Sequence, residues 1–158
     1  MSASIVFPLD PRTLSTAQQK KVNFRSRRIF SNPKVVAAMK AVRTVAQVYT
    51  SRVREVLDRF PSVRLSVVFY FAYPKSAPVK GRLPSEPMPT GADLDNRVKA
   101  FNDALTDAGW WDDARQITTL LVAKRLTTGK PRIEVSVSKD DGDDLFLTRD
   151  GVPYGTPP

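Results

Sequence analysis

The sequence predicts a small α+β domain in which two main helices pack against one mixed β-sheet of about four strands. Two segments carry apolar residues every three or four positions, which is the period of an amphipathic helix. Four shorter segments alternate apolar and polar residues or are apolar throughout, as strands do. The chain has 158 residues, which suits one compact domain. We expect that domain to span residues 1–139.

In the first half of the chain, a strand and a long helix are expected. The apolar run 5–9 predicts the strand. Asn32 is a preferred helix cap and Pro33 suits the first helical position, so the helix should begin there. Its apolar stripe points to an end near Phe60, where Pro61 stops it. The stripe comprises Val35, Val36, Met39, Val42, Ala46, Tyr49, Val53 and Val56.

The second half should supply a strand, a helix and two further strands. Residues 63–72 predict a strand inside the sheet, because both of its faces are largely apolar. Leu94, Val98, Phe101 and Leu105 mark the apolar face of the helix, and Gly109 ends it. The last strands are expected over residues 117–126 and 133–138.

Three segments show no periodicity of either kind. Residues 13–30 are basic, and we expect a loop there. Residues 74–91 hold five prolines and indicate a loop that is stiff in places. Residues 140–158 are acidic at first and then rich in Gly and Pro, so a poorly ordered tail is expected.

The charge is distributed unevenly along the chain. The net charge is +9, and residues 1–60 account for all of it, with 12 basic and 3 acidic side chains. A basic half joined to a neutral half favours a polyanionic partner such as nucleic acid. A basic surface without a partner is the alternative that composition leaves open.

The residues that are missing restrict the chemistry. No Cys is present, so disulfides and thiolate chemistry are excluded. No His is present either, so a metal site must consist of oxygen ligands, which favours Mg²⁺ or Mn²⁺ over zinc. No apolar run approaches the roughly 20 residues of a membrane span, and no leader peptide is evident. A cytoplasmic protein without a membrane partner or an organic cofactor is expected.

The tripeptide Asp93-Leu94-Asp95 is the strongest candidate for a metal site. If it is extended, both carboxylates point to one side and Leu94 points into the core. Two carboxylates that close together repel unless a cation or proton lies between them. The alternative is that Asp95 caps a helix starting near Asn96 while Asp93 is solvated.

Other polar residues follow along the same helix. Lys99 lies one turn after Asp95, where it could stabilise charge on a scissile phosphate or form a surface ion pair. Asp103 lies one further turn along, where it could orient Lys99 or a water, or be solvated. Trp110 and Trp111 follow the helix, and one of them could stack on an unpaired base instead of filling the core.

Asp112 and Asp113 come at the far end of that helix. A helix over residues 96–108 is about 20 Å long, so Asp113 cannot reach Asp93 unless the helix is shorter or a second chain supplies it. Both solutions are open at this point.

Taken together, the segment 91–124 resembles the RusA-type Holliday junction resolvases of bacteria and phages. The resemblance is carried by the D-L-D-N of residues 93–96, Lys99, the D-A-L of residues 103–105, and the aromatic pair before Asp112-Asp113. Gln116-Ile117 and Lys124 also fit. Ala92 departs from the pattern, because relatives often have Pro or a basic residue there.

The resemblance implies a homodimer that uses Mg²⁺, or Mn²⁺ in its place, to make paired nicks in four-way DNA junctions during recombination and repair. It implies that Asp93, Asp95 and Asp113 are catalytic acids and metal ligands, with Lys99 essential. Asp112, Asp103 and Asn96 would support the site. DNA would be bound by the basic residues Lys20, Lys21, Arg25, Arg27, Arg28, Lys75, Lys80, Arg82 and Lys124.

Two other functions are compatible with the residues alone. A DNA-binding module without catalysis would use the same basic half. A metal-dependent hydrolase of small phosphates would use the same acids, although the chain has no GxxxxGK[ST] loop of an NTPase.

Overall fold

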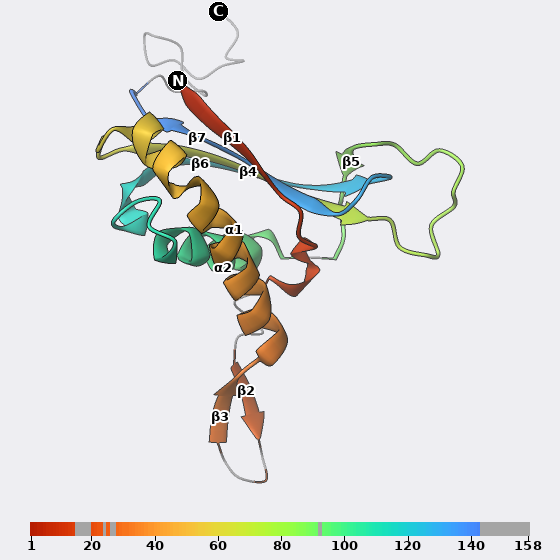
Figure 1. The fold of residues 1–158 in the computed structure, drawn as a ribbon. Helices are drawn as coiled ribbons and strands as arrows, with labels where there is room; N and C mark the ends of the chain where they lie inside the picture. The colour runs from red at the N-terminus through yellow and green to blue at the C-terminus, as the bar shows by residue number, and fades with distance from the viewer. Residues whose placement is uncertain (15–19, 24, 26–27, 92, 143–158) are drawn as a thin grey trace, which may run out of the picture.

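A computed structural model describes residues 1–14, 20–23, 25, 28–91 and 93–142, and for residues 20–23 and 28–31 it describes the backbone alone. The domain is α+β, with five strands in one sheet and two long helices on one of its faces (Figure 1). The sheet has the order β1-β7-β4-β6-β5. Its strands are β1 (Ser2–Phe7), β4 (Val63–Ala72), β5 (Glu86–Pro87), β6 (Ile117–Thr127) and β7 (Arg132–Lys139). The helices are α1 (Pro33–Leu57) and α2 (Leu94–Asp107).

The central pair of strands, β4 and β6, is parallel, and the other pairs are antiparallel. A parallel pair needs a long crossover connection, and here α2 lies within it. α2 therefore runs back across the sheet, and its two ends lie near opposite ends of β6.

The first helix begins as expected and ends earlier than expected. The Asn32 side chain accepts a hydrogen bond from the backbone N–H of Lys34, and Pro33 occupies the first turn. The helix ends at Leu57, before the predicted end near Phe60. Asp58 and Arg59 adopt left-handed backbone angles, with φ of 47° and 57°. The turn at these two residues ends the helix, so Pro61 is not its direct cause.

The core lies between the helices and the sheet. α1 contributes Val42, Ala46 and Val53, and α2 contributes Phe101 and Leu105, all fully buried. Alternate residues of β4 and β7 face them, which is the pattern expected when helices cover one face of a sheet. Among the described residues, no helix is long and apolar enough to cross a membrane.

Two expected loops contain short strands. The basic segment that was predicted as a loop forms an antiparallel hairpin, β2 (Lys20–Asn23) with β3 (Arg28–Ser31). The proline-rich segment contains β5, whose two residues pair with Leu126 and Arg125 of β6. These three strands have four, four and two residues and are too short for a period-2 pattern to be recognised in the sequence.

Asp140, the first residue of the expected tail, is held in place. Its carboxylate accepts hydrogen bonds from the hydroxyls of Thr118 and Thr119, each at 2.6 Å, and from Arg64 at 3.2 Å. These bonds lower the pKa of Asp140 to about 2. Residues 143–158, the rest of that tail, lie outside the described residues.

Candidate active site

The N-terminus of α2 carries the first two candidate acids. Asp93 is the N-cap residue, and its carboxylate accepts the backbone N–H of Asp95 at 3.2 Å and the side-chain amide of Asn96 at 2.8 Å. The helix starts at Leu94, so the tripeptide is not extended throughout, and Asp93 rather than Asp95 is the cap. Leu94 packs against the core as expected, while both carboxylates are exposed. The local geometry therefore presents two oxygen donors to solvent beside the positive end of the helix dipole.

Further along α2, Lys99 and Asp103 form an exposed polar row. Desolvation raises the pKa of Asp103, Lys99 opposes that effect, and Asp107 adds to it. The charge of Lys99 is therefore felt by Asp103. Whether Asp103 orients Lys99, orients a water or is simply solvated stays a prediction.

The second acidic pair is engaged by arginines. The Asp113 carboxylate accepts three hydrogen bonds from Arg115, two from its guanidinium at 2.8 and 3.0 Å and one from its backbone N–H at 2.8 Å. These bonds hold the pKa of Asp113 at about 2, below its ordinary value of 3.8. Asp112 pairs with Arg54 at 2.9 Å, and both partners of that pair are exposed.

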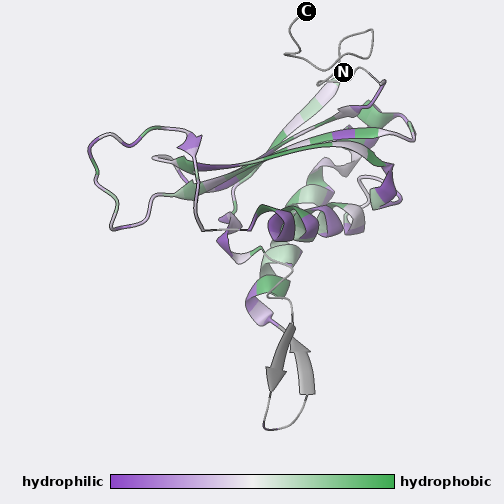
Figure 2. Cartoon of the chain, turned by 180° about the vertical axis from the view of Figure 1, so that it is seen from behind, coloured by the Kyte–Doolittle hydropathy of each residue, from purple (hydrophilic) through white to green (hydrophobic). Residues whose placement is uncertain are grey.

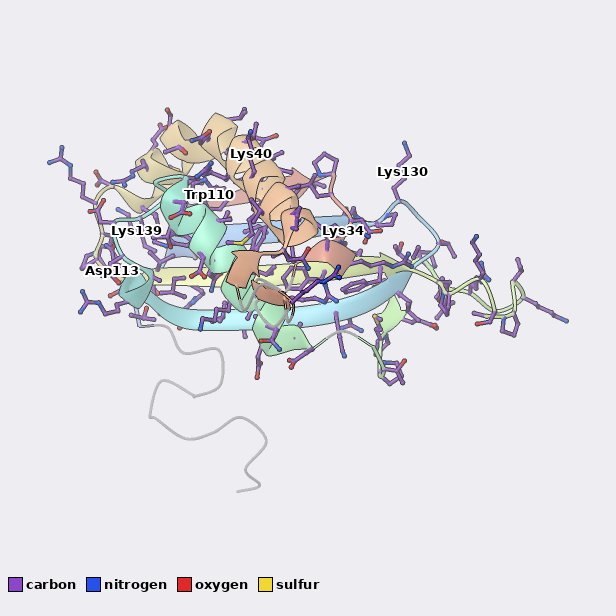
Figure 3. All side chains as sticks on the ribbon, turned by 90° about the horizontal axis from the view of Figure 1, so that it is seen from below. Lys34, Lys40, Trp110, Asp113, Lys130 and Lys139 are labelled. Atoms are coloured by element: carbon purple, nitrogen blue, oxygen red, sulfur yellow. The ribbon has the colours of Figure 1, made fainter. Side chains whose placement is uncertain are left out.

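Asp113 and the Asp93–Asp95 pair lie at opposite ends of α2. The helix has 14 residues, which corresponds to about 21 Å. Figure 3 shows Asp113 beside the start of β6, at the end of the molecule that also carries Lys139 and away from Lys130. Among the described residues, no three acidic side chains form a group that could hold a metal ion. The helix is not shorter than expected, so a shorter helix does not bring the predicted acids together.

Both tryptophans belong to the core, and the hypothesis that one stacks on a base is therefore wrong. Trp110 is fully buried and donates from its indole to the carbonyl of Ala46 at 2.9 Å, while Trp111 donates to the hydroxyl of Thr106 at 2.8 Å. Their rings meet edge to face at 6.0 Å. They fix the turn that carries the second acidic pair.

α1 also forms hydrogen bonds with the start of this turn, at residues 108 and 109. Thr50 donates to the carbonyl of Ala108 at 3.0 Å, and Arg54 donates to the carbonyl of Gly109 at 2.6 Å. Gly109 has a φ of 80°, which suits its predicted place at the end of the helix. The position of Asp113 is therefore set by two helices.

Arg97 is a structural residue of this region that was not singled out in the sequence. Its guanidinium donates to the carbonyls of Pro11 and, at 2.7 Å, Leu14, and it lies over the ring of Phe71. Desolvation lowers its pKa, and the nearby charges of Asp10 and Asp93 oppose that effect. Arg97 thus ties the chain before the basic hairpin to the first turn of α2. The signal in the sequence was a lone Arg between Leu94 and Val98, on the apolar side of the helix.

The predicted DNA contacts lie in different settings. Arg25, Lys75 and Lys80 are exposed. Arg82 is half-buried and uses its guanidinium within its own loop. The side chains of Lys20, Lys21 and Arg28, and all of Arg27, lie outside the described residues. Lys124 is half-buried on β6, where its carbonyl accepts the backbone N–H of Met88 at 3.3 Å.

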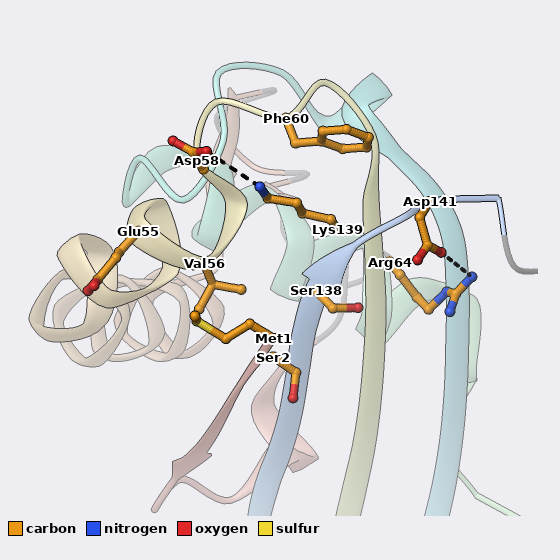
Figure 4. Close-up of a pocket in the computed structure, with 10 residues that line it drawn as sticks. All are labelled: Met1, Ser2, Glu55, Val56, Asp58, Phe60, Arg64, Ser138, Lys139 and Asp141. Atoms are coloured by element: carbon orange, nitrogen blue, oxygen red, sulfur yellow. Dashed lines mark ion pairs between the residues drawn. The ribbon is translucent and has the colours of Figure 1, made fainter.

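A cavity of about 620 Å³ lies between the end of α1 and the ends of β1, β4 and β7 (Figure 4). Lys139 pairs with Asp58 at 3.5 Å inside it and lies 5.7 Å from the ring centre of Phe60. None of the candidate acids lines this cavity. Asp112 lines a smaller hollow of about 160 Å³ together with Arg54, Trp110 and Trp111, whereas Asp93 and Asp95 are exposed at the start of α2.

The model of the endodeoxyribonuclease RusA family matches residues 8–138, which is most of the chain, so the chain belongs to that family. It is accordingly an endodeoxyribonuclease of the Holliday junction resolvase type. A search of curated proteins finds no match. The resemblance stated from the motif is confirmed, and the interpretation as a DNA-binding module without catalysis is not supported.

Proposed function

We propose that the chain resolves four-way DNA junctions by paired, symmetric nicks that depend on Mg²⁺. We further propose that a homodimer carries two identical sites, each formed by Asp93 and Asp95 of one copy and Asp113 of the other. The observation that carries this proposal is the placement of the acids at opposite ends of one helix.

A two-fold axis near the middle of α2 would bring Asp113 of one copy close to Asp93 and Asp95 of the other. In an interface with two-fold symmetry, a contact of residue i with residue j implies the contact of j with i. Two antiparallel copies of α2 would thus place each Asp113 opposite an Asp93–Asp95 pair. The two sites would lie about one helix length, roughly 20 Å, apart. Two separated and equivalent sites are what symmetric cutting of two strands requires.

The donor set fits a hard divalent cation in kind, because carboxylate oxygens are its preferred ligands and the chain has no His or Cys. Within one copy only Asp93 and Asp95 are close, so the fit is complete only with Asp113 from a second copy. When bound, Mg²⁺ supplies Lewis-acid stabilisation of charge on the phosphate and the leaving oxygen.

The chain's own residues have the following parts in this reaction. Asp93 and Asp95 hold the cation, and Asn96 orients Asp93 through its amide. Lys99 lies beside the scissile phosphate and stabilises the charge that develops on it. A carboxylate accepts the proton of the attacking water, because no His is present. The products have 5′-phosphate and 3′-hydroxyl ends, which a ligase can join.

The exposed basic residues bind the DNA arms by neutralising phosphates, so binding weakens steeply as salt rises. Equal junction binding at low and high salt would contradict this part of the proposal.

A cleavage assay tests the proposed reaction. A synthetic four-way junction and a linear duplex of the same sequence are incubated with the full chain, with and without Mg²⁺. Paired nicks in the junction alone, only with Mg²⁺, are expected. Cutting of the duplex at the same rate, or cutting without any divalent cation, would contradict the proposal. Mononucleotides serve as a control and should not be hydrolysed.

A further inference from the structure

The loop between β4 and β5, residues 73–85, forms a prong that leaves the sheet at one edge (Figure 1). Figure 2 shows that hydrophilic and hydrophobic residues are mixed along it. It contains three basic residues and no acidic one. Such a long connection without regular structure is uncommon in a compact domain and is usually functional.

The prong is held in one shape by its own side chains. Tyr73 lies at its base, where the phenol donates to the carbonyl of Leu83 at 3.2 Å and accepts the backbone N–H of Leu83 at 2.9 Å. Arg82 donates to the carbonyls of Pro78 at 3.0 Å and Ala77 at 2.5 Å. The Arg82 guanidinium also lies 5.2 Å from the centre of the Tyr73 ring. Arg82 therefore clamps the prong from within.

The far part of the prong presents an apolar side chain between cations. The backbone turns at Val79–Arg82, where Gly81 has a φ of 87° and Arg82 donates its N–H to the carbonyl of Val79 at 3.5 Å. Val79 is 79% exposed. Lys80 beside it is exposed, as is Lys75 on the other side of the turn. A single exposed valine is ordinary on a protein surface. A valine fixed at the turn of a stiff, purely basic projection is less ordinary.

The prong is joined directly to the candidate site. β5 returns the chain along β6, the N–H of Met88 donates to the carbonyl of Lys124 at 3.3 Å, and Asp93 follows five residues later. Five residues of chain span at most about 18 Å, so a phosphate at Asp93 lies within about that distance of the base of the prong.

We infer that the prong is a wedge that inserts Val79 between bases at the branch point while Lys75 and Lys80 bind the flanking phosphates. Apolar side chains that enter a base step unstack it, which costs free energy. That cost is lowest where stacking is already interrupted, as it is at a branch. The wedge would give the enzyme a means of recognising branched DNA that does not depend on base sequence. This inference rests on the proposed cleavage of junctions.

The test uses a four-way junction with 2-aminopurine at the branch point, because the fluorescence of this base rises when it is unstacked. All proteins carry Asp93→Asn, so the DNA is not cut. The chain with an intact prong should raise the fluorescence severalfold, and Val79→Ser should abolish most of that rise. The matched control is Val6→Ser, which makes the same change in a half-exposed residue of β1, at the opposite edge of the sheet. It should leave the rise intact.

Arg82→Lys is the second variant, because it keeps the charge and cannot clamp two carbonyls with a planar fork. It should lower the rise at least twofold. An equal rise with Val79→Ser, or no binding of the junction by any variant, would overturn the wedge. The proposed function is tested separately by cutting with Asp93 intact. If the junction is cut and the fluorescence does not depend on Val79, the wedge alone is wrong.

Discussion

A pair of aspartates lies near each end of α2, and the two pairs differ in the side chains that contact them. At the N-terminus, Asp93 accepts a side-chain amide and a backbone N–H, and Asp95 is exposed. At the other end, Asp113 is bound by Arg115 and Asp112 by Arg54. The first pair faces solvent at the start of the helix, whereas the second is engaged by arginine side chains. In the proposed two-copy site, Asp113 could take part only after the side chain of Arg115, which is 91% exposed, has been displaced from its carboxylate.

The largest effect is expected at the N-terminal end of α2, where Asp93 and Asp95 are exposed. Asp93→Asn should lower junction cleavage by about 10²–10³-fold, because a metal ligand and its charge are lost. Asn is as good a helix cap as Asp, so the melting temperature should stay unchanged. Cleavage rates and thermal unfolding of the same preparation check this. A fall in melting temperature that accounts for the lost activity would make the role of Asp93 structural.

A smaller effect is expected when Arg115, which binds Asp113 beyond the C-terminal end of α2, is replaced. Arg115→Ala removes the cation that competes for Asp113, so the Mg²⁺ concentration for half-maximal cleavage should fall, by up to about fivefold, since an exposed ion pair contributes about 0.2–1 kcal/mol. Arg115→Lys is the control and should change this Mg²⁺ concentration less. The titration is done at saturating junction, which separates metal binding from DNA binding. A higher Mg²⁺ requirement in the alanine variant would contradict the competition.

The ion pair between Asp113 and Arg115 should also affect how the stability of the protein depends on pH. The pKa of Asp113 should be about 2 by NMR titration and should rise toward 3.8 in Arg115→Ala. A carboxyl with a lowered folded pKa gives its full stabilisation above its unfolded pKa and loses it as the pH falls through the folded value. The stability difference between wild type and Arg115→Ala should therefore be present at pH 6 and disappear as the pH falls from about 4 to 2. A difference that grows on acidification would have the wrong sign.

The smallest effect is expected at Asp112. Its pair with Arg54 is exposed on both sides, so Asp112→Asn should change the free energy of unfolding by no more than about 1 kcal/mol. Cleavage should stay within about threefold of wild type. Urea unfolding and initial rates are the measurements. A loss as large as that of Asp93→Asn would mean that Asp112, and not Asp113, is the ligand from this end.

The parts of the fold that could be predicted are those with a local cause. Asn32 and Pro33 start α1, Gly109 ends α2, and the ten-residue strand β4 was recognised by its apolar faces. The end of α1 was misplaced because the left-handed turn at Asp58 leaves no strong signal in the sequence. The strands β2, β3 and β5 were missed because they have four, four and two residues.

The candidate site residues remain predictions, and the structure describes where they lie. The motif predicts Asp93, Asp95 and Lys99 as site residues, and the expected length of α2 already implied that Asp113 is distant from Asp93. Sequence alone did not show that Arg82 and Arg97 use their guanidinium groups on backbone carbonyls. Those partners are set by how the chain folds back on itself, and no spacing rule encodes them. The burial of both tryptophans was likewise decided by packing between α1, α2 and the sheet.

The most direct test of the shared site uses mixed dimers. A chain with Asp93→Asn and a chain with Asp113→Asn are refolded together, and the dimer with one copy of each is purified through two different tags. If each site takes Asp93 from one copy and Asp113 from the other, both defects fall in one site and the second site is intact. The mixed dimer should then nick one strand of the junction at roughly half the total wild-type rate, while each parent homodimer stays inactive. A mixed dimer as inactive as its parents would show that each site lies within one chain.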